Sequence, residues 1–201
     1  MSIPETRWAA AGDRSSHYGG RFAALVSSGQ DIDGEARLAD VLLPRHGRVL
    51  DAGAGMGRVA AALGTRGHDV VAIDPDPALV AQARATYPGL SIEQRDILSL
   101  GAADGPFDLV VCVGNVMVYL AEGTDRQALA AMGSVLGPQG RILVGFHLQD
   151  PPPHARHYTA AAFEADAEAA GLRVEQRFGS YDLRAPGEEY GVWILGPASE
   201  G

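Results

Sequence analysis

The chain has no lysine and only one cysteine among its 201 residues. The absence of lysine excludes every mechanism in which a lysine amine acts as a base or forms a covalent adduct. Cys112 has no partner for a disulfide within the chain and lies in an apolar run. These features predict a reduced, intracellular protein in which Cys112 is a small buried core residue and not a nucleophile.

The chain also has little positive charge and no long apolar stretch. Its formal net charge is −9 and its pI is near 5.0. A sequence-independent grip on phosphate backbones needs a surplus of basic residues, so nucleic acid is a disfavoured partner. No segment approaches the roughly 20 apolar residues of a membrane span, and the first residues lack the apolar core of a secretory signal. We therefore expect a cytoplasmic location and no membrane partner.

The length and the 46% hydrophobic content suit one well-buried core. We expect a single domain over residues 1–201. Within it, residues 1–46 form a short N-terminal helical cap and a lead-in helix, and residues 47–146 form a ligand-binding core. Residues 147–201 form a substrate-side loop, a helix and a terminal hairpin.

Short apolar runs alternate with helical patterns from Arg48 onward, which predicts a parallel sheet with helices on both faces. The expected strands are 49–50, 70–73, 90–93, 107–113 and 141–146, and the expected helices are 35–43, 58–66, 77–86, 124–136 and 159–170. Two further strands, Leu172–Phe178 and Tyr190–Leu195, have no helix between them. They predict an antiparallel hairpin at the edge of the sheet.

Local signals mark some of the boundaries. Asp76–Pro77 predicts a helix start with an aspartate cap and a proline in the first turn. Thr124 and Gln127 form the pattern of a capping box. Gly137–Gly140, with the sequence GPQG, predicts a break before the strand Arg141–Phe146.

The motif VLDAGAGMGR, Val49–Arg58, joins an apolar run to a glycine-rich turn that opens a helix. Gly53, Gly55 and Gly57 allow a tight turn and a close approach of a ligand to the backbone. The N–H groups at the start of the helix favour an anionic or electron-rich ligand group. Such a turn suits a dinucleotide, another nucleoside cofactor, or a close junction between strand and helix.

Polar residues follow four of the expected strands, namely Asp51, Asp74, Asp96 and Gly114–Asn115. The carboxyl ends of parallel strands line one crevice, where ligands bind. Asp74 lies 23 positions after Asp51, a distance that allows one helix and a return along the neighbouring strand. Its carboxylate can accept hydrogen bonds from a ribose. The alternative, that Asp74 binds a backbone N–H at the next helix, is less favoured because Asp76 is the better cap.

Asp96 and Ile97 can offer a purine an acceptor for its amine and an apolar surface, or Asp96 can simply be a turn residue. Asp51 can face a cationic amino group, or it can stabilise the loop through backbone hydrogen bonds. From the residues alone the turn interpretation is favoured for Asp96, and both alternatives stay open for Asp51.

Together these motifs resemble the class I S-adenosylmethionine-dependent methyltransferases. The similarity runs from VLDAGAGMGR through VVAID, RDIL and FDLVVCVGNVMVYL to LGPQGRILVGF, in the order and spacing of that family. The resemblance implies a Rossmann-like, doubly wound α/β fold with a seven-stranded, mostly parallel sheet whose last strand is antiparallel. It also implies S-adenosylmethionine as cofactor and S-adenosylhomocysteine as product.

The resemblance further implies a set of cofactor contacts. They are Asp51, Ala52, Gly53, Ala54, Gly55 and Gly57 around the methionine part, Asp74 and Pro75 at the ribose, Asp96 and Ile97 at the adenine, and Val113, Gly114 and Asn115 beside the cofactor. In similar enzymes the N-terminal cap folds over the cofactor, which makes Tyr18 a candidate contact and Arg21 and Trp8 weaker ones. These three can equally pack the cap against the domain.

The residues leave the catalytic group open. Methyl transfer needs alignment of donor and acceptor, and it needs a base only when the acceptor must lose a proton. His147, His154, His157 and Tyr158 are possible bases, and none is assigned. GNVMVY lacks the Asn/Asp-Pro-Pro-aromatic signature of enzymes that methylate base amines, which favours a small-molecule acceptor. No spacing predicts a metal site.

Two other classes of function remain. An NAD(P)-dependent oxidoreductase would use a similar glycine turn and ribose carboxylate, but GxGxG replaces GxGxxG here and no Tyr-x-x-x-Lys pair is present. A non-catalytic cofactor-binding or scaffold protein would keep the fold without turnover.

Overall fold

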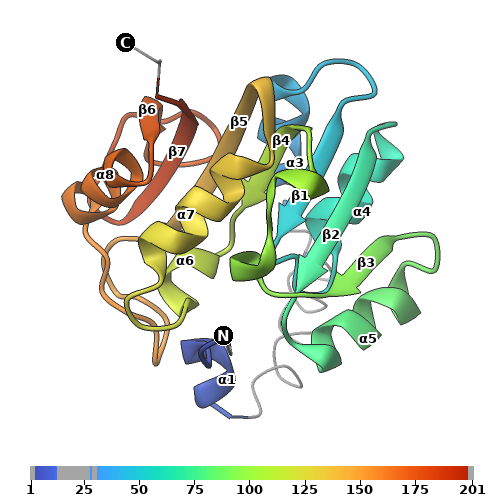
Figure 1. The fold of residues 1–201 in the computed structure, drawn as a ribbon, viewed down its shortest axis with the longest axis horizontal. Helices are drawn as coiled ribbons and strands as arrows, with labels where there is room; N and C mark the ends of the chain where they lie inside the picture. Colours follow the sequence, from blue (N-terminus) through green and yellow to red (C-terminus); the bar gives the residue numbers. More distant parts are fainter. Residues whose placement is uncertain (1–2, 13–27, 29–30, 199–201) are drawn as a thin grey trace.

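A seven-stranded sheet forms the centre of the protein, in a computed structural model that describes residues 3–12, 28 and 31–198 (Figure 1). The strands are β1 (Arg48–Ala52), β2 (Asp69–Asp74), β3 (Ser91–Gln94), β4 (Phe107–Cys112), β5 (Leu136–His147), β6 (Leu172–Phe178) and β7 (Tyr190–Pro197). Their order is β3-β2-β1-β4-β5-β7-β6. Neighbours from β3 to β5 are parallel, whereas β7 is antiparallel to β5 and to β6. This confirms the predicted sheet and its terminal hairpin, with β6 at the edge.

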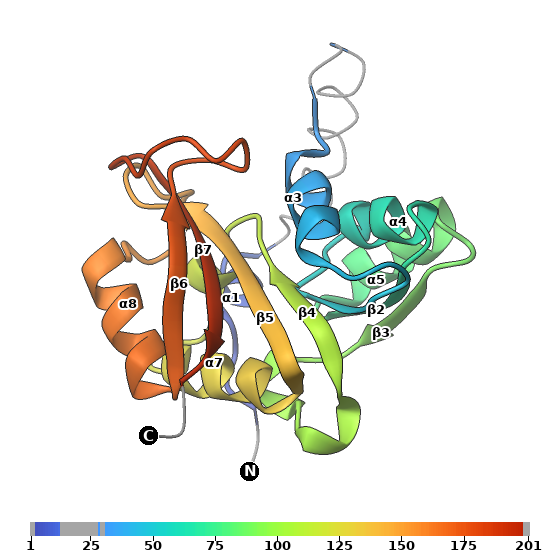
Figure 2. The same ribbon diagram turned by 90° about the horizontal axis from the view of Figure 1, so that it is seen from above.

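Helices cover both faces of the sheet, as the alternating pattern predicts (Figure 2). The described helices are α1 (Arg7–Ala10), α3 (Gly34–Leu42), α4 (Arg58–Thr65), α5 (Pro77–Thr86), α6 (Val116–Tyr119), α7 (Asp125–Ser134) and α8 (Ala160–Ala169). Two single 3₁₀ turns, η1 (Ile97–Ser99) and η2 (Ala102–Asp104), lie between β3 and β4. Helices α6, α7 and α8 pack in one core cluster, and α3, α4 and α5 pack on the opposite face.

Strand β4 explains why the central strands are apolar almost throughout. Val110 contacts the cluster under α7 and α8, whereas Leu109 and Val111 contact the cluster under α3 and α4. Cys112 is fully buried in the same strand, and burial raises the pKa of its thiol well above the ordinary value. A strand covered on both sides needs apolar residues at consecutive positions. Cys112 is therefore the small core residue that was predicted.

The predicted helix starts are confirmed where the cap is a local contact. Asp76 Oδ1 accepts a hydrogen bond from the N–H of Ala78 (2.8 Å), and α5 begins at Pro77. Thr159 Oγ1 accepts one from the N–H of Ala162 (3.2 Å) at the start of α8. Both side chains bind backbone groups within three residues, which is why sequence spacing identifies them.

Two local predictions are wrong. Thr124 makes no capping box with Gln127, because its hydroxyl donates instead to the carbonyl oxygen of Ala121 (2.8 Å). Gly137–Gly140 does not interrupt the chain before a strand, since β5 already begins at Leu136. Phe107 pairs with Leu136 and Leu109 pairs with Arg141, so the GPQG residues form an irregularity within the paired strand.

Candidate functional site

A pocket of about 420 Å³ opens at the carboxyl ends of the parallel strands. Eight of the predicted cofactor contacts line it: Gly53, Gly55, Asp74, Pro75, Asp96, Ile97, Gly114 and Asn115. They come from the loops that follow β1, β2, β3 and β4, which the parallel sheet brings to one edge. The sheet thus joins residues that lie up to 62 positions apart into one wall.

The glycine turn after β1 keeps the backbone close to the pocket. The N–H groups of Gly53 and Ala54 both donate to the carbonyl oxygen of Ile73 (2.9 and 3.0 Å), which fixes the turn against β2. Gly53 has φ +85°, and a Cβ built there would lie 2.6 Å from Val116 Cγ2. Only glycine combines this conformation with this separation.

Gly57 contacts different residues from those around Gly53. It also has a positive φ (+76°), but a Cβ there would collide with the side chain of Leu90 and approach Ala83. Its small size therefore serves the packing of the loop against α5 and β3. Gly57 and Ala52 do not line the pocket walls of the described structure, and Ala52 is fully buried. Their roles as cofactor contacts stay predictions.

Asp74 ends β2 and connects the pocket to two loops. Its Oδ2 accepts a hydrogen bond from the N–H of Gly55 (2.8 Å), and its Oδ1 accepts one from the N–H of Asp76 (2.9 Å). The residue is only 6% exposed, and burial raises the pKa of its carboxyl to about 6 despite these two hydrogen bonds. Asp74 thus lines the pocket and binds a backbone N–H at the next helix, as the less favoured alternative expects, while its role at a ribose stays a prediction.

Asp51 lies deeper, in a small hollow beside the main pocket. The hollow is lined by the glycine turn together with Asp51, Arg58 and Val113. Asp51 Oδ2 accepts a hydrogen bond from the N–H of Ala60 in α4 (3.0 Å), as the structural alternative expects. Burial raises the pKa of this carboxyl to about 7. A cation entering the hollow would favour its ionised form.

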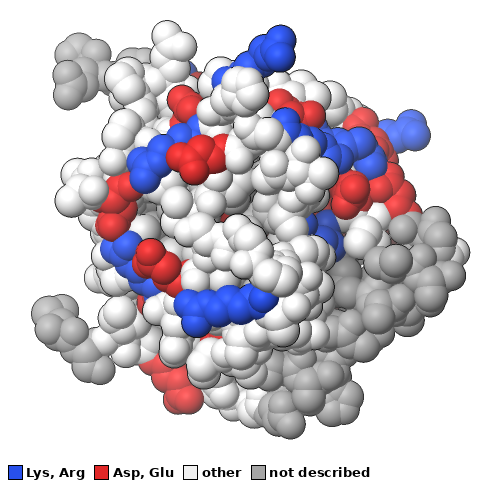
Figure 3. Space-filling model, turned by 90° about the vertical axis from the view of Figure 1, so that its right-hand side faces the viewer, with Lys and Arg blue, Asp and Glu red and all other residues white. Residues whose placement is uncertain are grey.

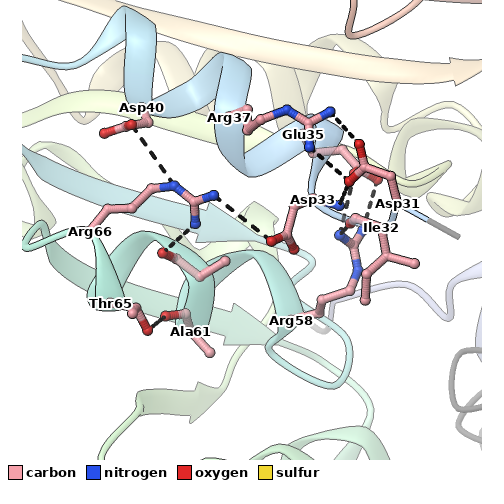
Figure 4. Close-up of polar contacts among 11 residues, drawn as sticks. Asp31, Ile32, Asp33, Glu35, Arg37, Asp40, Arg58, Ala61, Thr65 and Arg66 are labelled. Atoms are coloured by element: carbon pink, nitrogen blue, oxygen red, sulfur yellow. Dashed lines mark hydrogen bonds and ion pairs between the residues drawn. The ribbon is translucent and has the colours of Figure 1, made fainter. Parts of the chain in front are cut away.

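Arg58, the first residue of α4, was quoted in the glycine motif but not identified as a site residue. Its guanidinium donates to Glu35 Oε1 (2.8 Å) and to the carbonyl oxygen of Ile32 (Figure 4). Glu35 lies in the first turn of α3, so the contact ties the lead-in segment to the start of α4. An arginine directly after a glycine turn was the available signal, but its partner lies 23 positions away.

Asp96 and Ile97 follow β3 as predicted. Asp96 Oδ1 accepts a hydrogen bond from the N–H of Leu98 (2.8 Å) and so caps η1. Ile97 is 3% exposed and belongs to the core cluster under α7, while still lining the pocket. The pair therefore offers one acidic and one apolar surface side by side.

Trp8 in α1 lies at the mouth of the pocket. Its Nε1 donates to Asp76 Oδ2 (2.7 Å), and its ring meets the ring of Tyr119 edge to face at 5.3 Å. One of the two weaker N-terminal candidates is thus on the pocket wall. Tyr18 and Arg21 lie outside the described residues.

The remaining wall is largely apolar and was not predicted. It comes from α5, from α6 and the residue after it, and from the proline run that follows β5: Leu79, Val116, Tyr119, Leu120, Pro152 and Pro153. Tyr119 Oη donates to the carbonyl oxygen of Pro153 (3.3 Å), which holds the proline run beside α6. The run itself was visible in the sequence, but its position depends on the return of the chain from β5.

The four residues predicted as possible bases do not lie together in the structure. His154 and His157 are exposed in the loop after β5. Tyr158 is fully buried and donates to Asp166 Oδ2 (2.7 Å), so it is a core residue. His147 ends β5 and contacts Asn115. No group of three or more possible metal ligands occurs within the described ranges, and no helix there is long and apolar enough to cross a membrane.

Comparison with known proteins gives a consistent result. A family model described as a methyltransferase domain matches residues 49–140. A probable S-adenosylmethionine-dependent methyltransferase of Mycolicibacterium smegmatis is 31% identical over 66% of this chain and 54% of its own length. A ubiquinone biosynthesis O-methyltransferase of Xanthomonas axonopodis pv. citri is 31% identical over 72% of this chain and 66% of its own. The chain thus spans about half the length of the first curated relatives.

A solved structure is similar over nearly its whole length. The TehB-like SAM-dependent methyltransferase from Corynebacterium glutamicum is 36% identical, with a TM-score of 0.83. The match covers 91% of this chain and 97% of the other. The similarity therefore extends well beyond the residues that the family model matches.

Proposed function

This chain belongs to the class I S-adenosylmethionine-dependent methyltransferases, and we propose that it transfers a methyl group from that cofactor to a small-molecule acceptor. The observation that carries the proposal is the glycine turn after β1, which lies beside the buried carboxylate of Asp74. Gly53 lies so close to Val116 that a Cβ would collide with it, so the turn backbone itself lines the pocket, and Asp74 lies 6% exposed on the same wall.

The residues of the pocket fit the cofactor's groups. Asp74 would accept hydrogen bonds from the ribose, and Ile97 with Asp96 would contact the adenine. Asp51 would face the amino group of the cofactor's methionine part. Arg58 borders the same hollow, and its positive charge suits the carboxylate of that methionine part. These assignments rest on the family resemblance and on the chemistry of the side chains.

When bound, the cofactor supplies an activated methyl group on a sulfonium that is already a good leaving group. The protein's contribution is then to hold the acceptor in line with that group and to keep competing water away. Asn115 and Gly114, at the end of β4, border the pocket where the two reactants would meet.

An unidentified small molecule is the acceptor that the pocket suits. The wall beyond the cofactor contacts carries Trp8, Tyr119, Leu120 and the two prolines, and it has the apolar character of a small-molecule site. On the face shown in Figure 3, basic side chains are interspersed with acidic ones. The described residues of this face offer no continuous basic track for a nucleic-acid backbone, in line with the net charge of −9.

Calorimetric titration of ligand-stripped protein tests the proposal. We expect S-adenosylmethionine and S-adenosylhomocysteine to bind with micromolar dissociation constants, about −8 kcal/mol, and NAD and NADP not to bind. A preference for the dinucleotides would contradict the proposal. Cofactor binding without product formation across an acceptor library would favour the scaffold alternative.

Cofactor affinity should depend on pH through the two buried carboxyls. The pKa is raised to about 6 for Asp74 and to about 7 for Asp51, in both cases chiefly by burial. Because a cationic, hydroxyl-rich ligand favours the ionised forms, binding must release the protons that the free protein holds below these values. We expect affinity for S-adenosylmethionine to fall about 10-fold or more from pH 8 to pH 5.

Calorimetry at pH 6.5 in two buffers with different ionisation enthalpies measures the released protons directly. Asp74→Asn cannot titrate and should release fewer protons than the wild type. Equal affinity at pH 5 and pH 8 would show that neither carboxyl is coupled to the ligand.

A further inference from the structure

The side chain of Asn115 connects the cofactor pocket to a histidine on the next strand. Asn115 lines the pocket and begins α6 with φ +76°, a conformation that asparagine tolerates better than most residues. Its Oδ1 accepts a hydrogen bond from the backbone N–H of His147 at 2.9 Å. The same oxygen lies 3.0 Å from Nδ1 of the His147 ring.

These two contacts determine which ring nitrogen carries the proton. A backbone N–H can only donate, so the amide atom that faces it must be the oxygen and not the NH₂ group. Since that oxygen can only accept, Nδ1 must be the donor in the second contact. In the neutral imidazole the lone pair is then on Nε2.

The ring is also held from a second strand. Tyr190 pairs with His147 in the antiparallel contact of β7 with β5, and the two rings meet edge to face at 4.8 Å and 89°. The hydroxyl of Tyr190 contacts that of Tyr181 at 3.0 Å, which places Tyr190 in a larger packed group. His147 itself is exposed at the carboxyl end of β5, and its partner Asn115 lines the pocket.

We propose that His147 is the general base for an acceptor hydroxyl, and that Asn115 is a positioning residue that sets its tautomer. This inference rests on the proposed methyl transfer and adds the class of acceptor. The hydroxyl oxygen forms the new bond to the methyl carbon, and the carbon–sulfur bond breaks with its electron pair going to sulfur. The hydroxyl proton passes to Nε2, and the imidazolium returns it to solvent.

A hydroxyl acceptor explains why an oriented imidazole is present at this position. A carboxylate acceptor is already ionised at neutral pH and needs no base, whereas a phenol or alcohol must lose a proton during the transfer. In other enzymes in which a base activates a nucleophile, a third group hydrogen-bonds to the base and keeps it oriented. The Asn115 amide would orient His147 in the same way.

Nitrogen-15 NMR of the protein without cofactor tests the tautomer. We expect neutral His147 to carry its proton on Nδ1 in the wild type. Asn115→Gly, which removes the amide and suits the positive φ, should allow the Nε2–H form. Asn115→Asp should restore the wild-type tautomer, because a carboxylate accepts from both N–H groups. An Nε2–H ring in the wild type, or no change in Asn115→Gly, would overturn the role of Asn115.

The acceptor class is tested with a panel of phenols and hydroquinones and a matched panel of benzoates, measuring S-adenosylhomocysteine formation. We expect turnover of hydroxyl acceptors, a fall in kcat of about 100-fold or more in His147→Gln, and an unchanged dissociation constant for S-adenosylmethionine. His157→Gln, an exposed histidine ten residues away, is the matched control and should keep the wild-type rate.

The outcomes separate this inference from the proposed function. Failure of S-adenosylmethionine to bind the wild type would overturn both. If the cofactor binds but only benzoates react, if no phenol reacts, or if His147→Gln keeps the wild-type kcat, the base assignment fails and the family assignment stands.

Discussion

Asp74→Ala is expected to weaken the binding of S-adenosylmethionine by about 100-fold. In the proposed ribose site the variant loses two hydrogen bonds between the ligand's hydroxyls and a carboxylate, each of which would contribute about 1.5 kcal/mol or more. The structure adds a second effect, because the Asp74 carboxylate also accepts the N–H groups of Gly55 and Asp76. Losing these contacts loosens the glycine turn, so we expect the free energy of unfolding to fall by about 1–2 kcal/mol.

The matched control is Asp69→Ala. Asp69 is the same residue type at the other end of β2, its side chain is 72% exposed, and its ion pair with Arg48 is long at 3.7 Å. An exposed pair of this kind contributes little, so both affinity and stability should stay near the wild-type values. Calorimetry for binding and urea denaturation for stability measure the two effects separately. Unchanged affinity in Asp74→Ala would remove Asp74 from the ribose site.

Gly53→Ala should produce the second large effect, on both stability and binding. The added Cβ would lie 2.6 and 2.7 Å from the two methyl carbons of Val116, and the residue must keep φ +85°. Backbone strain of this type costs about 1–3 kcal/mol, and overpacking adds a similar amount. The clash is relieved by a shift of the turn or of the Val116 side chain, and both line the pocket, so we expect cofactor affinity to fall at least about 10-fold.

Gly64→Ala provides the comparison within the next helix. Gly64 lies in α4, and a Cβ there has no heavy atom within 4 Å. Alanine in the helix should raise the free energy of unfolding by about 0.5–1 kcal/mol and leave cofactor binding unchanged. Normal affinity and stability in Gly53→Ala would mean that the close approach of Gly53 and Val116 does not restrict the turn.

Most strands and helices were predictable because their signals are local. The start of α5 at Pro77 follows from a cap that contacts residues two and three positions away. Strand β4 follows from an apolar run, and the hairpin of β6 and β7 follows from the lack of a helix between two such runs. Of the two local errors, the bulge in β5 depends on its register with β4, whereas Thr124 bonds to a carbonyl oxygen three residues earlier in place of the predicted capping box.

The sequence predicted the pocket residues that lie at the strand ends, and it did not predict the residues that form the side walls of the pocket. Eight predicted residues line one pocket because parallel strands deliver their carboxyl ends to one edge, a rule that needs no coordinates. The apolar wall from Leu79, α6 and the two prolines has no comparable rule. The division of the chain at residues 46 and 146 and the predicted cofactor contacts stay predictions, and Tyr18, Ala52 and Gly57 are not among the described pocket-lining residues.

The sequence by itself determined the parallel sheet with its terminal hairpin and the acidic strand ends, because these depend on periodicity and on spacing along the chain, and its motifs carried the family resemblance. Only the tertiary structure decided the partners of the polar side chains. Arg58 binds Glu35 across 23 positions, Asn115 binds His147 across 32, and Trp8 binds Asp76 across 68. Such contacts follow from strand order, register and helix packing. A hydrogen bond requires its atoms to lie within about 3 Å, and no local pattern specifies that distance between remote segments.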